Sequence, residues 1–200
     1  MRRTILMVTT IALSLLLASG VALAVNKIGT NGPDTLRGTN ADDHLVGLGG
    51  NDQLFAFRGD DSLLGGSGKD MLWARTSSGD SYGGHKTMLG GSGNDFVYGG
   101  KVSDNIVGGG GKDYLFEGAE PDVAKPDILS AGDGNDAVWV LNWDPTGKDV
   151  LSCGSGFDRV LADRTDSIAD DCEKVFVGRR HIDEWFESIP ESFWEGLPQF

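Results

Sequence analysis

The chain has little of what most enzymes and nucleic-acid-binding proteins need. Its 200 residues include 2 cysteines and 3 histidines, and 17 basic residues stand against 30 acidic ones, for a net charge of −13. This acidity argues against nucleic acid as a partner, because binding to phosphates needs an excess of Lys and Arg. Neither G-x-S-x-G nor H-E-x-x-H occurs, which excludes the usual serine-hydrolase elbow and the commonest zinc-protease site. We therefore expect no catalytic activity.

Long apolar runs are also scarce, and the one present lies at the N-terminus. Two arginines precede an apolar run from Ile5 to Leu17, and an A-x-A cleavage pattern ends at Ala24. We expect residues 1–24 to be a signal peptide and 25–28 a short lead-in. The run is short for a membrane span, and an uncleaved anchor is the alternative. The protein is accordingly predicted to be secreted or on the cell surface, with no membrane span.

Glycine, in contrast, is abundant, with 31 residues, and it recurs with a period of nine. Five nonapeptides follow one another without a gap: GTNGPDTLR, GTNADDHLV, GLGGNDQLF, AFRGDDSLL and GGSGKDMLW. Three insertions, ARTSSGD, EGAEP and VLNW, let the register continue over thirteen repeats to Leu161. Twelve repeats have Asp at the sixth place, with Lys86 as the exception, and all thirteen have Leu, Ile, Val or Met at the eighth.

These repeats follow the pattern GGxGxDxUx, and they resemble the RTX family of hemolysin-type calcium-binding nonapeptide repeats. The resemblance covers residues 29–161. It implies an all-β fold, a right-handed parallel β-roll in which two nonapeptides make one coil. It also implies calcium ions between successive coils, held by the sixth-place Asp and by backbone carbonyls of the Gly-rich turns. The residues favour the same cation, because calcium takes six to eight hard oxygen ligands and glycine leaves carbonyls accessible.

Alternate repeats are expected on opposite edges of the roll, so the repeats separate by parity into two sets. The seven turns of edge one all have Gly at the fourth place and Asp at the sixth, whereas three of the six turns of edge two have that Gly. Seven stacked turns leave gaps for up to about six ions on edge one. The predicted ligands are Asp34, Asp52, Asp70, Asp95, Asp113, Asp136 and Asp158.

Edge two is predicted to hold one or two ions. Its candidate ligands are Asp43, Asp61 and Asp104, with the best site between the turns of Asp43 and Asp61. No ion is expected around Lys86, because an ammonium replaces a ligating carboxylate there. The three insertions fall immediately before edge-two turns. The expected total is about six to eight calcium ions. The alternative is that these Asp residues form Asx-type turns without metal.

The ninth place of the edge-one repeats carries aromatic side chains that we expect on the outer face of one sheet. They are Phe55, Trp73, Tyr98, Phe116 and Trp139. Such a row is a large apolar strip for a soluble surface, so it needs either a cover or a ligand. An extracellular polysaccharide or protein partner is the candidate ligand.

Two further segments follow the roll. Residues 162–178 are predicted to form a terminal coil, with a disulfide between Cys153 and Cys172. Residues 179–200 form an amphipathic tail, since apolar residues recur with helical spacing from Ile182 to Ile189. We expect the tail to cover the roll, and binding to a membrane surface or to a partner is the alternative.

The overall prediction is a secreted, non-catalytic calcium-binding protein with a structural or surface role, which folds outside the cell as ions fill the turns. Two other functions stay open. One is an adhesion module that binds a polysaccharide or a protein through the aromatic row. The other is a membrane-active cytolysin, for which the sequence contains no apolar pore-forming segment.

Overall fold

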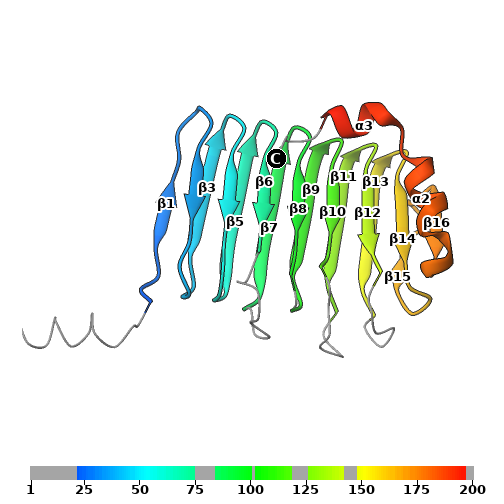
Figure 1. The fold of residues 1–200 in the computed structure, drawn as a ribbon, viewed down its shortest axis with the longest axis horizontal. Coiled ribbons are helices and arrows are strands. Elements are labelled where there is room, and N and C mark those ends of the chain that lie inside the picture. The colour runs from blue at the N-terminus through cyan, green and yellow to red at the C-terminus, as the bar shows by residue number, and fades with distance from the viewer. Residues whose placement is uncertain (1–21, 75–83, 101, 119–125, 142–147, 197–200) are drawn as a thin grey trace, which may run out of the picture.

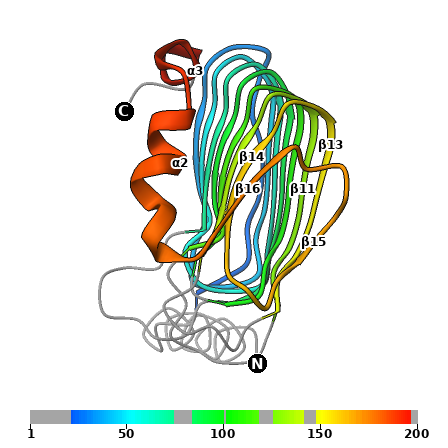
Figure 2. The same ribbon diagram turned by 90° about the vertical axis from the view of Figure 1, so that its right-hand side faces the viewer.

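The computed structural model describes residues 22–74, 84–100, 102–118, 126–141 and 148–196. These residues form two parallel eight-stranded sheets that lie face to face (Figures 1 and 2). Within the described residues no helix is long and apolar enough to cross a lipid bilayer. The parallel β-roll expected from the repeats is confirmed. The predicted signal peptide lies almost entirely outside the described residues.

The two sheets take alternate strands of the chain. One has the order β1-β3-β5-β7-β9-β11-β13-β15 and the other the order β16-β14-β12-β10-β8-β6-β4-β2. The strands of the first sheet are β1 (Asn26–Ile28), β3 (His44–Gly49), β5 (Asp61–Ser67), β7 (Lys86–Ser92), β9 (Asn105–Gly111), β11 (Ile128–Gly134), β13 (Val150–Gly156) and β15 (Ser167–Ile168). Those of the second are β2 (Thr35–Arg37), β4 (Gln53–Phe55), β6 (Met71–Trp73), β8 (Phe96–Tyr98), β10 (Tyr114–Phe116), β12 (Ala137–Val140), β14 (Arg159–Ala162) and β16 (Lys174–Val177).

The core lies between the sheets and is made by the eighth place of each repeat. Strand side chains alternate between two faces, so the residue in the middle of each short strand points inward. From Leu45 onward these residues are at most 1 % exposed, for example Leu54, Met88 and Leu129, whereas Leu36 in the first coil is partly buried. Each is paired in register with the eighth-place residue two repeats away, as Leu54 is with Leu72. The predicted sorting of repeats by parity is therefore confirmed.

The insertions begin one residue later than the sequence reading placed them. Ala74 and Glu117 still follow the strand register, because their N–H groups donate to the carbonyls of Tyr98 and Trp139 in the next coil. Val140 likewise belongs to β12 and pairs with Ala162. Each residue therefore takes the first place of an edge-two turn, and the extra residues come after it. The physical reason is that the parallel ladder satisfies one more backbone group before the chain departs.

The tail folds onto the aromatic face at the C-terminal end of the roll. It forms a short 3-10 helix η1 (Arg179–His181), then α2 (Ile182–Ser188) and α3 (Glu191–Gly196), with Pro190 at the break between the helices. Figure 2 shows α2 and α3 beside the sheet that contains β14 and β16. Trp185 is fully buried, and its ring lies edge-on to that of Trp139, with 5.5 Å between centroids.

The outer face is more aromatic than the ninth place alone predicted. The seventh place also points outward, and it adds Phe96 and Tyr114, whose rings stack at 5.3 Å. Tyr114 is 9 % exposed and contacts both Trp185 and Trp194 of the tail. The tail therefore covers the C-terminal half of the face, as expected of a cover.

The terminal coil is held to the roll by a covalent bond. The expected disulfide joins Cys153 to Cys172, with 5.2 Å between their Cα atoms. The carboxylate of the neighbouring Asp171 accepts hydrogen bonds from the backbone N–H groups of Cys153 and Gly154. Strands β15 and β16 complete the last coil and pair with β13 and β14.

Candidate calcium sites

Edge one brings all seven predicted Asp residues into a single column. The backbone N–H of each donates to Oδ1 of the Asp in the next coil at 2.8 Å, from the Asp34–Asp52 pair to the Asp136–Asp158 pair. The column continues beyond the repeats, because the N–H of Asp158 donates to Oε2 of Glu173 at 2.9 Å. Glu173 was not a candidate ligand in the sequence reading, since it lies outside the nonapeptides.

The second oxygen of these carboxylates is left without a partner. Oδ2 is buried and accepts no hydrogen bond within the described residues in Asp52, Asp70, Asp95, Asp113, Asp136 and Asp158. A buried carboxylate oxygen without a donor is strongly unfavourable. Because such an oxygen recurs in successive coils, a cation bound in each gap between coils would satisfy it.

Glycine holds the first place of the edge-one turns as far as Gly108, and it leaves space beside that oxygen. A Cβ added to Gly65 would lie 2.6 Å from Oδ2 of Asp70 and 2.5 Å from the carbonyl oxygen of Gly90 in the next coil. The same addition to Gly90 would meet Oδ2 of Asp95 at 2.5 Å and the carbonyl oxygen of Gly108 at 2.6 Å. Glycine therefore leaves carboxylate and carbonyl oxygens of adjoining coils exposed to one small space. This hard-oxygen donor set fits calcium.

Burial opposes ionisation of these carboxyl groups when no metal is bound. It raises the pKa of Asp113 to about 8, and the neighbouring carboxylates of Asp95 and Asp136 add to the effect. It raises the pKa of Asp95 and of Asp136 to about 7, and that of Asp70 to about 6. Backbone N–H donors lower each value but do not offset burial. A bound cation would reverse the balance by favouring the charged form.

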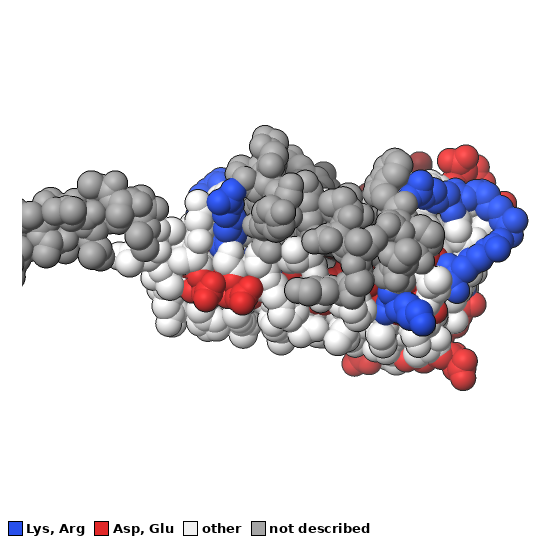
Figure 3. Space-filling view, turned by 90° about the horizontal axis from the view of Figure 1, so that it is seen from below, with Lys and Arg blue, Asp and Glu red and all other residues white. Residues whose placement is uncertain are grey.

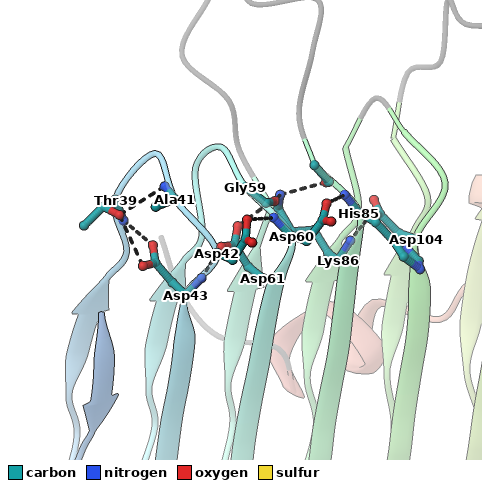
Figure 4. A network of polar contacts seen from close by, with 11 residues as sticks. Thr39, Ala41, Asp42, Asp43, Gly59, Asp60, Asp61, His85, Lys86 and Asp104 are labelled. Atoms are coloured by element: carbon teal, nitrogen blue, oxygen red, sulfur yellow. Dashed lines mark hydrogen bonds and ion pairs between the residues drawn. The ribbon is translucent and has the colours of Figure 1, made fainter. Parts of the chain in front are cut away.

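The first turn of each edge differs from the turns that follow. The carboxylate of Asp34 accepts hydrogen bonds from the N–H of Thr30 at 2.6 Å and from its Oγ1 at 2.9 Å. Asp43 is bonded in the same way to Thr39, as Figure 4 shows. Asp34 and Asp43 therefore already have hydrogen-bond donors. In the first turn of each column a threonine supplies them.

Edge two has a cation of its own. Nζ of Lys86 lies 3.0 Å from Oδ2 of Asp61, and it donates to the carbonyl oxygens of Gly59 at 2.5 Å and Gly84 at 2.8 Å. Lys86 is 1 % exposed, and Figure 4 shows its side chain between the two turns. The ammonium thus takes one carboxylate and two carbonyl oxygens, the donors that an ion would take in an edge-one gap.

The rest of edge two continues as a ladder. Asp104 accepts from the N–H of Lys86 at 2.7 Å, and Asp149 accepts from the N–H of Asp127 at 2.8 Å. Oδ2 of Asp104 is buried and accepts no hydrogen bond within the described residues, and burial raises the pKa of that group to about 7. Asp127 and Asp149 were not among the candidate ligands predicted from the sequence. Figure 3 shows the roll from this side.

The comparison with protein families agrees with this geometry. The model of the RTX calcium-binding nonapeptide repeat matches in four copies, over residues 28–56, 37–72, 87–123 and 124–140. The roll is an RTX calcium-binding nonapeptide-repeat domain. RTX repeats bind Ca²⁺ as a family property, and the two Asp columns are made by the sixth-place residues of these repeats. A search among curated proteins found no match.

Proposed function

We propose that this chain is an exported, non-catalytic calcium-binding protein whose RTX roll folds when calcium ions enter the gaps between coils. The repeated buried Oδ2 of edge one carries the proposal, because it is unfavourable without a cation and recurs in successive coils. The proposed ligands are the seven Asp residues of edge one, together with Asp43, Asp61 and Asp104 on edge two.

Calcium and folding are coupled through charge. Without metal, carboxylates stacked at strand spacing repel one another and their burial is costly. The unfolded chain is acidic and rich in glycine, so it gains little by collapsing. Each bound ion would join two coils, which makes folding and binding cooperative. Dissociation constants of about 0.1–1 mM suit an extracellular module, where free calcium is plentiful.

Circular dichroism of the full chain tests this proposal. We expect a largely disordered spectrum in EDTA and a β-rich spectrum after calcium is restored, with a sigmoidal dependence on calcium concentration. Magnesium at the same concentration is the matched control, because it prefers a rigid octahedral shell with several waters. A β-rich spectrum that survives exhaustive chelation above about pH 8, where the edge-one carboxyl groups are ionised, would falsify calcium-coupled folding.

A second candidate function rests on the part of the aromatic face that lies away from the tail. Phe55, Trp73 and Tyr98 are half-buried, and the rings of Trp73 and Tyr98 stack with 5.2 Å between centroids. Stacked aromatic rings suit the apolar faces of sugar rings. Quenching of Trp fluorescence by soluble glycans, lost in Trp73→Ala but kept in Trp139→Phe, would support a polysaccharide-binding role. Unchanged fluorescence would remove it.

A further inference from the structure

Edge two contains a cluster of three buried carboxylates that the repeat pattern does not explain. Glu117, Asp127 and Asp149 each offer one carboxylate oxygen, and these oxygens lie within 4.8 Å of one another. All three residues are at most 1 % exposed. Asp127 and Asp149 hold sixth places in successive turns, whereas Glu117 has no counterpart in the nonapeptide consensus.

Glu117 is the one acidic residue at a place where the other described coils have Gly, Ala or, at Val140, an apolar side chain. Its row on edge two is defined by N–H groups that donate to the ninth-place carbonyl of the next coil, and it contains Gly38, Ala56, Ala74, Gly99 and Glu117. At Gly38 an added Cβ would already lie 2.5 Å from Oδ2 of Asp43 and 2.6 Å from the carbonyl oxygen of Ala56. A side chain in this row therefore points into the space between coils, and that of Glu117 places a carboxylate there.

Among the described residues, no N–H or O–H group donates a hydrogen bond to the carboxylate of Glu117. Both of its oxygens are buried without a hydrogen-bond partner among the described residues, and the residue is 0 % exposed. Burial raises the pKa of Glu117 well above its usual range, and the charges of Asp149 and Asp127 act in the same direction. The side chain is thus aimed into a closed, acidic space that lacks a counter-charge among those residues.

We propose that Glu117, Asp127 and Asp149 together bind one calcium ion in a three-carboxylate site. Calcium–oxygen distances are about 2.3–2.6 Å, so ligand oxygens on opposite sides of one ion lie about 5 Å apart, which the spacing of this cluster matches. The inference rests on the proposed calcium-dependent folding and adds a ligand type that the consensus lacks.

The charge of this site sets its order of filling. Calcium affinity rises with the number of ligating carboxylates. The Glu117 site has three within reach, whereas an edge-one gap is built from one sixth-place Oδ2 and backbone carbonyls. We therefore expect this site to fill at the lowest calcium concentration, and to order the two coils that flank it before edge one is complete.

Calcium titration of the full chain tests the site, by calorimetry and by competition with a fluorescent calcium chelator. Glu117→Ala should lose the tightest binding step, so that one ion fewer is bound or one site weakens at least tenfold. Alanine already occupies this row at positions 56 and 74, so the variant should keep the roll in saturating calcium. Asp95→Asn is the matched control, because it should weaken an edge-one site and leave the tightest step unchanged.

The outcomes separate this inference from the proposed function. An unchanged ion count and unchanged affinities in Glu117→Ala would overturn the three-carboxylate site while leaving calcium-coupled folding intact. Absence of calcium binding by the wild-type chain would overturn both. A variant that is more stable than the wild type at saturating calcium, with no ion lost, would mean that the cluster holds a proton instead of a metal. Glu117→Gln, which keeps the side-chain size, gives the same readouts if the alanine variant does not fold.

Discussion

The two edges of the roll solve the same electrostatic problem in different ways. Edge one repeats one arrangement without interruption, and from Asp52 to Asp158 each coil there contributes a buried Asp whose Oδ2 accepts no hydrogen bond within the described residues. Edge two carries the insertions, and in one gap the ammonium of Lys86 takes the position between a carboxylate and two carbonyls. A gap between coils therefore needs a positive charge. Either a bound ion or the ammonium of a lysine side chain can provide it.

Lowering the pH is the first test of the difference between the two edges. Protons should replace calcium on the edge-one carboxylates. Burial raises the pKa of Asp113 to about 8 and that of Asp95 and Asp136 to about 7, against an ordinary value of 3.8. The folded, metal-free chain therefore holds more protons than the unfolded chain between pH 3.8 and these values. Its stability is greatest below pH 3.8 and falls as pH rises towards about 8.

Circular dichroism in EDTA across this range measures the effect. We expect β structure near the acid end and its loss near the upper end, with recovery at the upper end when calcium is added. A metal-free spectrum that does not change across the range would contradict the account of edge one.

Lys86 offers the second test. One substitution removes its charge and another replaces its ammonium by a carboxylate. Lys86→Met would leave the buried carboxylate of Asp61 unpaired and should destabilise the roll by about 3–5 kcal/mol in denaturant unfolding. Lys86→Asp restores the sixth-place carboxylate and should add one calcium ion to the titration. If Lys86→Met has wild-type stability and Lys86→Asp binds no additional ion, the ammonium does not act as a substitute cation.

The third test compares the middle of edge one with its open end. Asp113→Asn removes a charged ligand from the most buried part of the column. A hundredfold weaker site would cost about 2.7 kcal/mol at saturating calcium and lower the melting temperature by about 5–10 °C. Asp34→Asn should have the smaller effect, because Asp34 is half-buried and is already bonded to Thr30. Equal losses in the two variants would show that the column is uniform along its length.

Much of the fold could be predicted, because the period of nine residues fixes which residues of successive coils lie side by side. Strand pairs such as Leu54 with Leu72 follow from the eighth place, and the Asp columns follow from the sixth. The covering tail was also readable, since Trp185 and Ile189 have helical spacing and both become buried.

The features that the sequence did not reveal arise from residues outside the consensus. Glu117 belongs to a segment that was read as an interruption, and only the strand register shows that it holds the first place of a turn. Lys86 was expected to disable a site, whereas its side chain is long enough to reach the carbonyls of Gly59 and Gly84 and to occupy the site. Tyr114 joined the aromatic face because the seventh place points outward, and that place is too variable to stand out in the sequence.

The calcium stoichiometry of the folded chain tests the central claim most directly. An isothermal titration that follows both heat and β-sheet signal should show cooperative binding of about six to eight ions, most of them on edge one. Binding of about eleven ions would mean that both edges load equally, and it would contradict the difference between the edges. Folding without any bound calcium above about pH 8, where the edge-one carboxyl groups are ionised, would contradict the account as a whole.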